Sequence, residues 1–252
     1  MSGPVHDQLE ALRAVPEQTG ILTDFDGTLA EIVDEPTDAR PLEGVPELLE
    51  GLAARYAVVA VLSGRPVSFL RTWLPSPVVL SGLYGLEIVR DGVFVDHPDA
   101  GLWRPVIDEV FEVAHAAGPE ELRVEHKGLS LTLHFRGNPE VRAEVHAFAQ
   151  QLAERSGLSV RPARMSFELH PPIEVDKGTA LRDLTVGLAA VCFIGDDVGD
   201  LPAFRALDAL AREGVTAVRV GVRSEEAPSE LLDAVDLVVD GPAGARDLLA
   251  RL

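Results

Sequence analysis

The most constraining feature of this 252-residue chain is the segment Gly-Ile-Leu-Thr-Asp-Phe-Asp-Gly-Thr-Leu at residues 20–29. Ile21 and Leu22 belong to a short apolar run that ends at two carboxylates, Asp24 and Asp26. Such a run beside glycine is typical of a buried parallel strand, and open α/β sheets carry their chemistry at the carboxyl ends of these strands. Two Asp side chains there suit a nucleophile and a proton carrier around a hard cation. For this segment alone, a strand that ends in an ordinary polar turn remains an alternative.

The pattern of apolar residues along the rest of the chain predicts an α/β core with an insert. Apolar runs predict further strands at residues 57–62, 78–80, 190–194, 217–220 and 237–239. Helical spacing predicts helices at residues 5–15, 41–55, 67–73, 101–117, 139–156, 180–186, 202–210 and 243–252. Between 100 and 172 the strands alternate apolar and polar residues, which indicates a separate α+β layer. We therefore expect a Rossmann-like parallel-sheet core made of residues 1–99 and 173–252, with an inserted α/β domain at residues 100–172.

Charge and cysteine content limit the partners and the compartment. Acidic residues outnumber basic ones by 41 to 22, and the formal net charge is -19. Such a surface repels nucleic acid and anionic lipid, so we expect neither as a partner. Cys192 is the single cysteine, which favours a reducing compartment. Residues 1–10 do not resemble a signal peptide, and no apolar run approaches the roughly 18 residues of a membrane span. We therefore expect a cytoplasmic protein, and its oligomeric state stays open.

Further polar residues lie next to the predicted strands and helices of the core. They are Ser63, Lys177, Asp196, Asp197 and Asp200. Taken singly, each is common, because Ser-Gly forms turns, Lys-Gly is usually solvated and Asp-Asp often caps a helix. Their occurrence together with the two Asp residues of the first strand, in this order, indicates one catalytic site.

These residues resemble the four motifs of the haloacid dehalogenase superfamily of phosphatases. Motif one is residues 24–29, motif two is Ser63 within Val-Leu-Ser-Gly-Arg, motif three is Lys177, and motif four is residues 195–200. The resemblance covers the whole core, and the insert at residues 100–172 matches the α/β cap of the superfamily. It implies Mg²⁺-dependent phosphoryl transfer, which depends on in-line positioning and on charge neutralisation.

The resemblance also implies a role for each motif residue. Asp24 would be the nucleophile that forms an aspartyl-phosphate, which splits one difficult step into two. Asp26 would give a proton to the leaving oxygen and later take one from water. Ser63 and Lys177 would hold the phosphate. The implied Mg²⁺ ligands are Asp24, the backbone carbonyl of Asp26 and Asp196, and the implied auxiliary acids are Asp197 and Asp200.

A sharper resemblance is to trehalose-6-phosphate phosphatases. Residues 82–87, Gly-Leu-Tyr-Gly-Leu-Glu, resemble their Gly-x-His-Gly-x-Glu segment. Residues 124–136 resemble their cap strands, and residues 164–178 resemble the stretch that leads to motif three. The resemblance implies a sugar phosphate substrate whose hydroxyl groups are contacted by charged side chains. We expect the substrate-binding residues to be Thr28, Arg65, Glu125, Lys127, Arg136, Arg164 and Glu168. Arg65 is either part of the phosphate loop or an ion-pair partner, and both interpretations stay open.

Three positions depart from the pattern of this family. Tyr84 stands where the family often has His, Gly199 where it commonly has Thr, and Leu201 where it commonly has an acid. They leave the motif Asp and Lys residues intact, so they bear on the substrate more than on the reaction. One alternative is therefore a related cap-bearing phosphatase for another sugar phosphate or a glucosylated phosphoglycerate. Another is a non-catalytic sugar-phosphate-binding regulator, although a binding protein has no need of a proton carrier beside the nucleophile.

Overall fold

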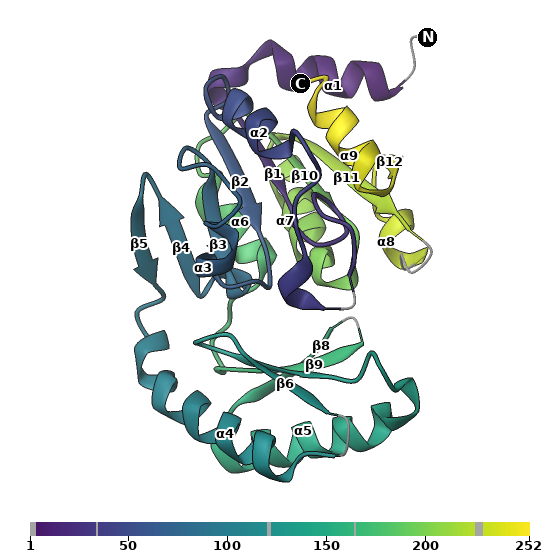
Figure 1. Ribbon diagram of the computed structural model, residues 1–252. Coiled ribbons are helices and arrows are strands. Elements are labelled where there is room, and N and C mark those ends of the chain that lie inside the picture. The colour runs from purple at the N-terminus through teal and green to yellow at the C-terminus, as the bar shows by residue number, and fades with distance from the viewer. Residues whose placement is uncertain (1–3, 34, 120–121, 164, 225–228) are drawn as a thin grey trace. The chain divides into compact units, whose positions relative to one another are not determined.

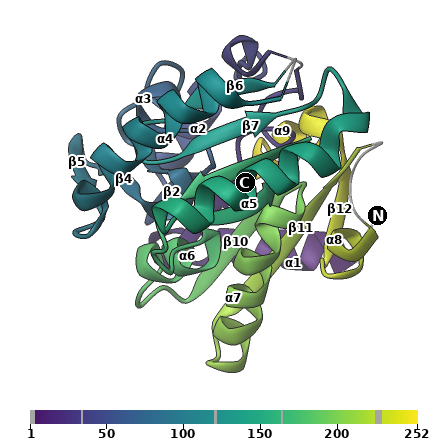
Figure 2. The same cartoon turned by 90° about the horizontal axis from the view of Figure 1, so that it is seen from below.

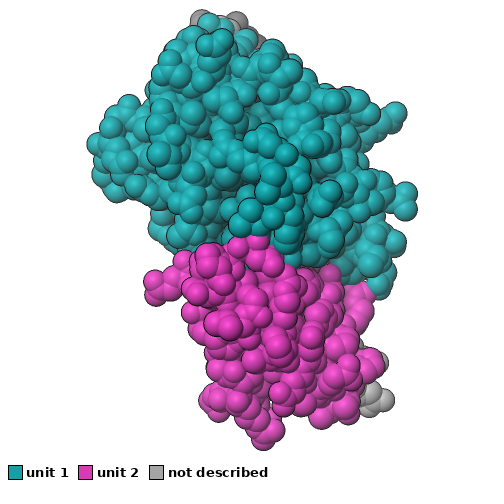
Figure 3. All heavy atoms as spheres, turned by 90° about the vertical axis from the view of Figure 1, so that its left-hand side faces the viewer, with its two compact units in different colours: residues 1–95, 175–252 teal, residues 96–174 magenta. Residues whose placement is uncertain are grey.

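The computed structural model of the chain describes residues 4–33, 35–119, 122–163, 165–224 and 229–252. Contacts within the chain define two compact units, coloured separately in Figure 3. Unit 1 is Met1–Val95 with Val175–Leu252, and unit 2 is Asp96–Glu174. The functional division into a core and a cap remains a prediction, with the boundaries of the cap at residues 100 and 172.

Unit 1 contains an eight-stranded sheet with the strand order β12-β11-β10-β1-β2-β3-β4-β5 (Figure 1). Neighbouring strands from β12 to β3 are parallel, and β4 runs antiparallel to β3. This arrangement confirms the prediction of a mostly parallel α/β core. The strands are β1 Thr19–Thr23, β2 Val58–Leu62, β3 Val79–Gly82, β4 Glu87–Arg90, β5 Val93–Asp96, β10 Ala190–Gly195, β11 Thr216–Arg223 and β12 Leu237–Asp240.

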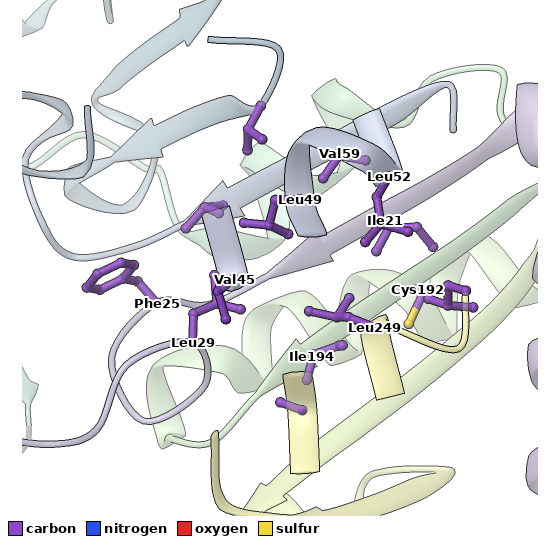
Figure 4. Packing of buried hydrophobic residues seen from close by; sticks show 14 of the residues in the cluster. Ile21, Phe25, Leu29, Val45, Leu49, Leu52, Val59, Cys192, Ile194 and Leu249 are labelled. Carbon is purple, nitrogen blue, oxygen red and sulfur yellow. The ribbon is translucent and has the colours of Figure 1, made fainter. Parts of the chain in front are cut away.

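Helices cover both faces of this sheet, which explains why its central strands are apolar without alternation. Ile21 packs in a cluster with residues of α1, α2 and α9, part of which Figure 4 shows. The next residue, Leu22, packs in a second cluster with residues of α6, α7 and α8. The helices of unit 1 are α1 Pro4–Ala14, α2 Val45–Ala53, α3 Val67–Leu70, α6 Lys177–Leu184, α7 Leu201–Arg212, α8 Ser229–Asp233 and α9 Gly241–Leu249.

The register of the parallel strands brings the candidate site residues to one edge of the sheet. Leu22 of β1 is paired with Ala60 of β2 and with Phe193 of β10. Because the three strands run in the same direction, the segments that follow them leave the sheet at the same edge. Motif one follows β1, motif two follows β2 and motif four follows β10.

Unit 2 is a four-stranded antiparallel sheet with the order β6-β7-β9-β8 and two helices over one face. Figure 2 shows α4 and α5 running over its strands. Along β7, Leu131 and Leu133 pack in the apolar cluster of this unit, whereas Thr132 between them points to the other face. The elements are α4 Arg104–Ala117, β6 Arg123–His126, β7 Leu131–His134, α5 Arg142–Ser156, β8 Ser159–Ala163 and β9 Ser166–His170.

Several element bounds differ from the predicted ones, each for a local reason. Helix α6 begins at Lys177 rather than residue 180, because the Asp176 side chain accepts a hydrogen bond from the backbone N–H of Thr179 and caps the helix. Helix α2 begins at Val45 rather than residue 41, after Gly44 in the left-handed region. Helix α8 was not predicted. Short 3-10 turns join the elements: η1 Pro16–Gln18, η2 Pro36–Asp38, η3 Leu83–Gly85, η4 Ala100–Trp103, η5 Pro139–Val141 and η6 Val198–Asp200. Among the described residues, none of the helices combines the length and apolarity of a membrane span.

Candidate active site

A buried ion-pair cluster links motifs one, three and four in unit 1. The ammonium group of Lys177 donates hydrogen bonds to Oδ1 of Asp24 and to Oδ1 of Asp200, both at 2.6 Å. The Lys177 side chain is 4% exposed, that of Asp24 7% and that of Asp200 0%. Two short charge-assisted hydrogen bonds at a buried position hold Lys177 in one place.

Burial and these charges shift the pKa values of the cluster. Burial acts to lower the pKa of Lys177, but the adjacent charges of Asp200 and Asp24 outweigh it and raise the pKa, so the ammonium form is held. Burial raises the pKa of Asp24 to about 7, against the opposing effect of Lys177. A neighbouring cation therefore stabilises the carboxylate form of Asp24. This is the form that acts as a nucleophile.

Asp200 also fixes the backbone of motif four. Its Oδ2 accepts hydrogen bonds from the backbone N–H groups of Asp196 at 2.9 Å and of Asp197 at 3.1 Å. Both oxygens of Asp200 are thus used within the cluster, one by Lys177 and one by the loop. Asp197 is half-buried, and its side chain accepts from the backbone N–H of Val198 and caps η6.

Three buried carboxylates are placed where they could hold a metal ion. Asp24, Asp196 and Asp200 each offer an oxygen, and these oxygens lie within 4.8 Å of one another. Carboxylate oxygens are the ligands that hard divalent cations prefer. The ammonium group of Lys177 pairs with two of these acids, Asp24 and Asp200, and an added cation would neutralise further negative charge of the cluster. The donor set therefore fits a divalent cation.

Gly27 allows motif one to lie directly against motif four. Its φ is +78°, and a Cβ at this position would lie 2.0 Å from Oδ2 of Asp196. Only glycine tolerates both the left-handed backbone and this approach. Thr28, the next residue, is fully buried, and its hydroxyl oxygen has no hydrogen-bond partner among the described residues. Its predicted role in substrate binding remains a prediction.

Arg65 forms an ion pair in the structure, and its predicted contact with substrate remains a prediction. Its Nε and Nη2 donate to the two oxygens of Asp26, each at 2.8 Å, and its Nη1 donates to the backbone oxygen of Pro36 at 2.6 Å. The guanidinium also lies over the ring of Phe69, 4.5 Å from its centroid. Ser63 is buried and its Oγ accepts from the backbone N–H of Arg65 at 3.1 Å. Motif two thus holds the carboxylate of Asp26 by a bidentate pair.

Two of the candidate sugar-binding residues of unit 2, Glu125 and Glu168, share the face of its sheet that is opposite the helices. Glu125, Thr132, Glu168 and Arg161 lie side by side across the four strands. Glu168 is 1% exposed, and its Oε2 lies 3.6 Å from Nζ of Lys127.

The structure gives further contacts for one residue of this row and the burial of another predicted residue of unit 2. Glu125 pairs with Nε2 of His134 at 2.8 Å. Arg136 is half-buried in the turn after β7. Arg164 lies outside the described residues, so its predicted role stays a prediction.

Sequence reasoning missed two residues that shape the site. Glu87 is buried at the start of β4, and its carboxylate accepts from the backbone N–H of Val67 at 2.8 Å, at the first residue of α3. Asp176 caps the helix that carries Lys177. The signal for Asp176 was present, because Asp followed three residues later by Thr is a usual start of a helix. A signal for Glu87 was also present, because it is the Glu that ends the segment at residues 82–87.

Comparison with known proteins supports the same family for the whole arrangement. The trehalose-phosphatase family model matches residues 22–234. The trehalose-phosphate phosphatase of Mycobacterium ulcerans is 31% identical over 263 residues, which cover 96% of this chain and 65% of that protein. The chain spans 57% of the corresponding protein of Mycobacterium leprae, so it covers less than two thirds of these curated relatives.

Similarity to known structures extends over the whole fold. The C-terminal domain of C. albicans trehalose-6-phosphate phosphatase has a TM-score of 0.78 at 20% identity, over 98% of this chain and 96% of that chain. A haloacid dehalogenase-like hydrolase from Bacteroides thetaiotaomicron has a TM-score of 0.60 at 16% identity, over 92% and 97% of the two chains. At these identities the likeness shows a shared fold.

Proposed function

Because this chain belongs to the trehalose-phosphatase family, we propose that it is a phosphatase that hydrolyses trehalose 6-phosphate to trehalose and phosphate. The observation that supports this activity most is the contact between Lys177 and Asp24 at 2.6 Å in a buried cluster. A binding site for phosphate alone has no need of a buried carboxylate, which repels the ligand unless it reacts with it.

The residues of unit 1 suit a reaction in two steps. The carboxylate of Asp24 attacks phosphorus, and Lys177 holds that carboxylate and contacts a phosphate oxygen. When one of its oxygens leaves Arg65 and takes up a proton from solvent, Asp26 gives that proton to the leaving sugar oxygen, and then takes a proton from the water that hydrolyses the aspartyl-phosphate. The bidentate pair with Arg65 holds the Asp26 carboxylate in one orientation before substrate binds. The hydroxyl of Ser63 donates a hydrogen bond to a phosphate oxygen.

We propose Mg²⁺ as the metal of this site, which two of the three carboxylates would hold. The ligands are Asp24 and Asp196, with the backbone oxygen of Asp26, and the role of Asp200 is to brace Lys177 and the motif-four loop. A bound Mg²⁺ would neutralise charge on the transferring phosphoryl group. The side chain of Asp197 caps η6. We therefore keep Asp197 as an auxiliary acid and not as a metal ligand.

The polar face of the unit 2 sheet supports a sugar as the leaving group. A disaccharide offers many hydroxyl groups, and Glu125 and Glu168 can accept from them whereas Lys127 can donate. We propose that these three side chains bind the sugar. We also expect the protein to act in the cytoplasm, as its sequence predicts.

The test is phosphate release from trehalose 6-phosphate, glucose 6-phosphate, a glucosylated phosphoglycerate and p-nitrophenyl phosphate, each with Mg²⁺ and with excess chelator. We expect trehalose 6-phosphate to be the preferred substrate, activity to be lost in chelator, and Ca²⁺ to restore it poorly because its longer bonds disturb the in-line geometry. Asp24→Asn should remove turnover of every substrate, because an amide does not form the aspartyl-phosphate. Preference for another sugar phosphate would contradict trehalose 6-phosphate as the substrate. Absence of any turnover would favour the interpretation that the protein is a non-catalytic regulator.

A variant of unit 2 separates the substrate from the reaction. Glu168→Ala should lower kcat/KM for trehalose 6-phosphate by about 10- to 100-fold, the worth of one charged hydrogen bond, and leave p-nitrophenyl phosphate nearly unchanged. Glu154→Ala, at an exposed position of α5, is the matched control and should change neither. Equal losses on both substrates for Glu168→Ala would remove the support for sugar binding by this face.

A further inference from the structure

The 3-10 turn η3 at the end of β3 holds an unusual backbone in the middle of the candidate site. Leu83 and Tyr84 have φ values of +50° and +59°, in the left-handed region. Each such residue with a side chain costs on the order of 1 kcal/mol or more, and strain of this kind gathers at functional sites. Turn geometry alone could be met by glycine, which stands just before and just after these two residues. A bulky aromatic residue in this conformation therefore indicates a functional role for its side chain.

Hydrogen bonds join this turn to motif two. The backbone N–H of Tyr84 donates to the oxygen of Ser63, and that of Leu83 donates to the oxygen of Arg65, both at 3.0 Å. The two acceptors flank Gly64, so the turn is held on both sides of this residue. Gly64 itself lies against the side chain of Tyr84.

The phenol ring of Tyr84 lies close to two of the catalytic loops of unit 1. A Cβ built on Gly64 would lie 2.7 Å from the Tyr84 hydroxyl, so the hydroxyl rests on the backbone of the residue that follows Ser63. A Cβ built on Gly199 would lie 3.8 Å from the Cε1 atom of the ring, so one ring edge faces the residue that precedes Asp200. The ring is half-buried. It therefore borders the space next to Ser63, which the proposed function assigns to the phosphate, and next to Asp200, which holds Lys177.

We propose that Tyr84 is a specificity-determining residue that contacts the sugar of the substrate beside the phosphate ester. This inference rests on the proposed function, which assigns the phosphate to Ser63 and Lys177. A phosphate bound there has its ester oxygen and the first carbon atoms of the leaving group next to the loops that the ring borders. A phenol suits such a position, because its hydroxyl both donates to and accepts from sugar hydroxyl groups, while its ring packs against C–H groups.

The test compares two substrates that share the phosphate but differ in the leaving group. Tyr84→Phe keeps the ring and removes the hydroxyl, and Tyr56→Phe is the control, because the Tyr56 hydroxyl is buried and donates to the backbone oxygen of Leu252. For Tyr84→Phe we expect the ratio of kcat/KM for the sugar phosphate to that for p-nitrophenyl phosphate to fall about 3- to 10-fold, the worth of one neutral hydrogen bond. For Tyr56→Phe the ratio should stay unchanged.

A second pair of variants checks that the ring occupies the stated place. Gly64→Ala should lower activity on both substrates, because its Cβ meets the Tyr84 hydroxyl. The same substitution combined with Tyr84→Ala should recover activity on p-nitrophenyl phosphate but not selectivity for the sugar phosphate. Such a recovery is the signature of two side chains that compete for one space.

The possible outcomes separate this inference from the proposed function. If the wild type prefers its best sugar phosphate and Tyr84→Phe keeps that preference, or loses both activities equally, the assignment of Tyr84 is overturned and the proposed function stands. If the wild type hydrolyses p-nitrophenyl phosphate but no sugar phosphate, both are overturned.

Discussion

Replacing Lys177 by Met should destabilise the fold far more than the loss of an ordinary ion pair. Methionine keeps most of the volume of the side chain but removes the charge that pairs with Asp24 and Asp200. Those carboxylates would then lie buried together with Asp196 and without the ammonium group between them. Breaking a buried pair by removing one partner typically costs about 3–5 kcal/mol. For a chain of this length that corresponds to a fall in Tm of roughly 6–20 °C.

The cost should depend on pH in a defined direction. Burial raises the pKa of Asp24 to about 7 even with Lys177 present, and removal of Lys177 raises that pKa further. A carboxyl group whose pKa is higher in the folded state than in the unfolded state loses stability as pH rises through the folded value. The deficit of Lys177→Met should therefore be smaller at pH 5.5, where Asp24 takes up a proton, than at pH 8.

The assay is urea unfolding in excess chelator at both pH values, followed by the midpoint and by the free energy of unfolding. Arg182→Met is the matched control, because the pair of Arg182 with Glu213 spans 3.2 Å but its side chains are 44% and 54% exposed. An exposed pair contributes about 0–1 kcal/mol. Equal, small effects of the two substitutions, or a larger deficit at pH 5.5, would refute the reasoning about the buried cluster.

Three further predictions each follow from a single feature of unit 1. Gly27→Ala should remove turnover and lower the free energy of unfolding by more than Gly44→Ala, because both glycines have positive φ but only a Cβ at Gly27 meets Asp196; equal losses in urea unfolding would contradict this. Burial raises the pKa of the Cys192 thiol to about 12, so a thiol reagent at pH 8 should modify it only as the protein unfolds, and rapid modification of the folded protein would contradict its burial. Asp176→Ala should cost about 1 kcal/mol, the usual worth of a helix cap, and lower kcat; an unchanged Tm would show that α6 does not need the cap.

Much of the fold could be predicted because the sheet of unit 1 is covered on both faces. Ile21 and Leu22 pack on opposite faces, so both are apolar and the strand reads as a continuous run. Parallel strands in turn bring the residues that follow them to one edge. Asp24 and Lys177 are far apart in the chain, yet their positions beside predicted elements were enough to expect them in the same site.

What could not be predicted depends on particular side chains and backbone angles. The ion pair of Arg65 could not be predicted, because it depends on the distance between its guanidinium and Asp26. The start of α6 was placed too late. Glycine at position 178 has a low helix propensity, but the cap by Asp176 allows the helix to begin at Lys177. The left-handed backbone of Leu83 and Tyr84 has no counterpart in any residue propensity, because neither residue favours that region.

The pairing of β1 sets a condition on how this chain folds. On one side β1 pairs with β2, its near neighbour in the sequence, but on the other side it pairs with β10, so Ile21 must meet Cys192 across the entire insert. Contacts between such distant segments form slowly, because the entropy of closing the long loop is lost before the stabilising contacts are made. During synthesis, the ribosome would release β1, β2 and the whole of unit 2 before the partner strand β10 emerges, and one edge of β1 would stay open until then. Lys177 and Asp200 also emerge late, so the catalytic cluster would be assembled in the last stage of folding, and a stalled or truncated chain would carry the nucleophile without the charges that control it.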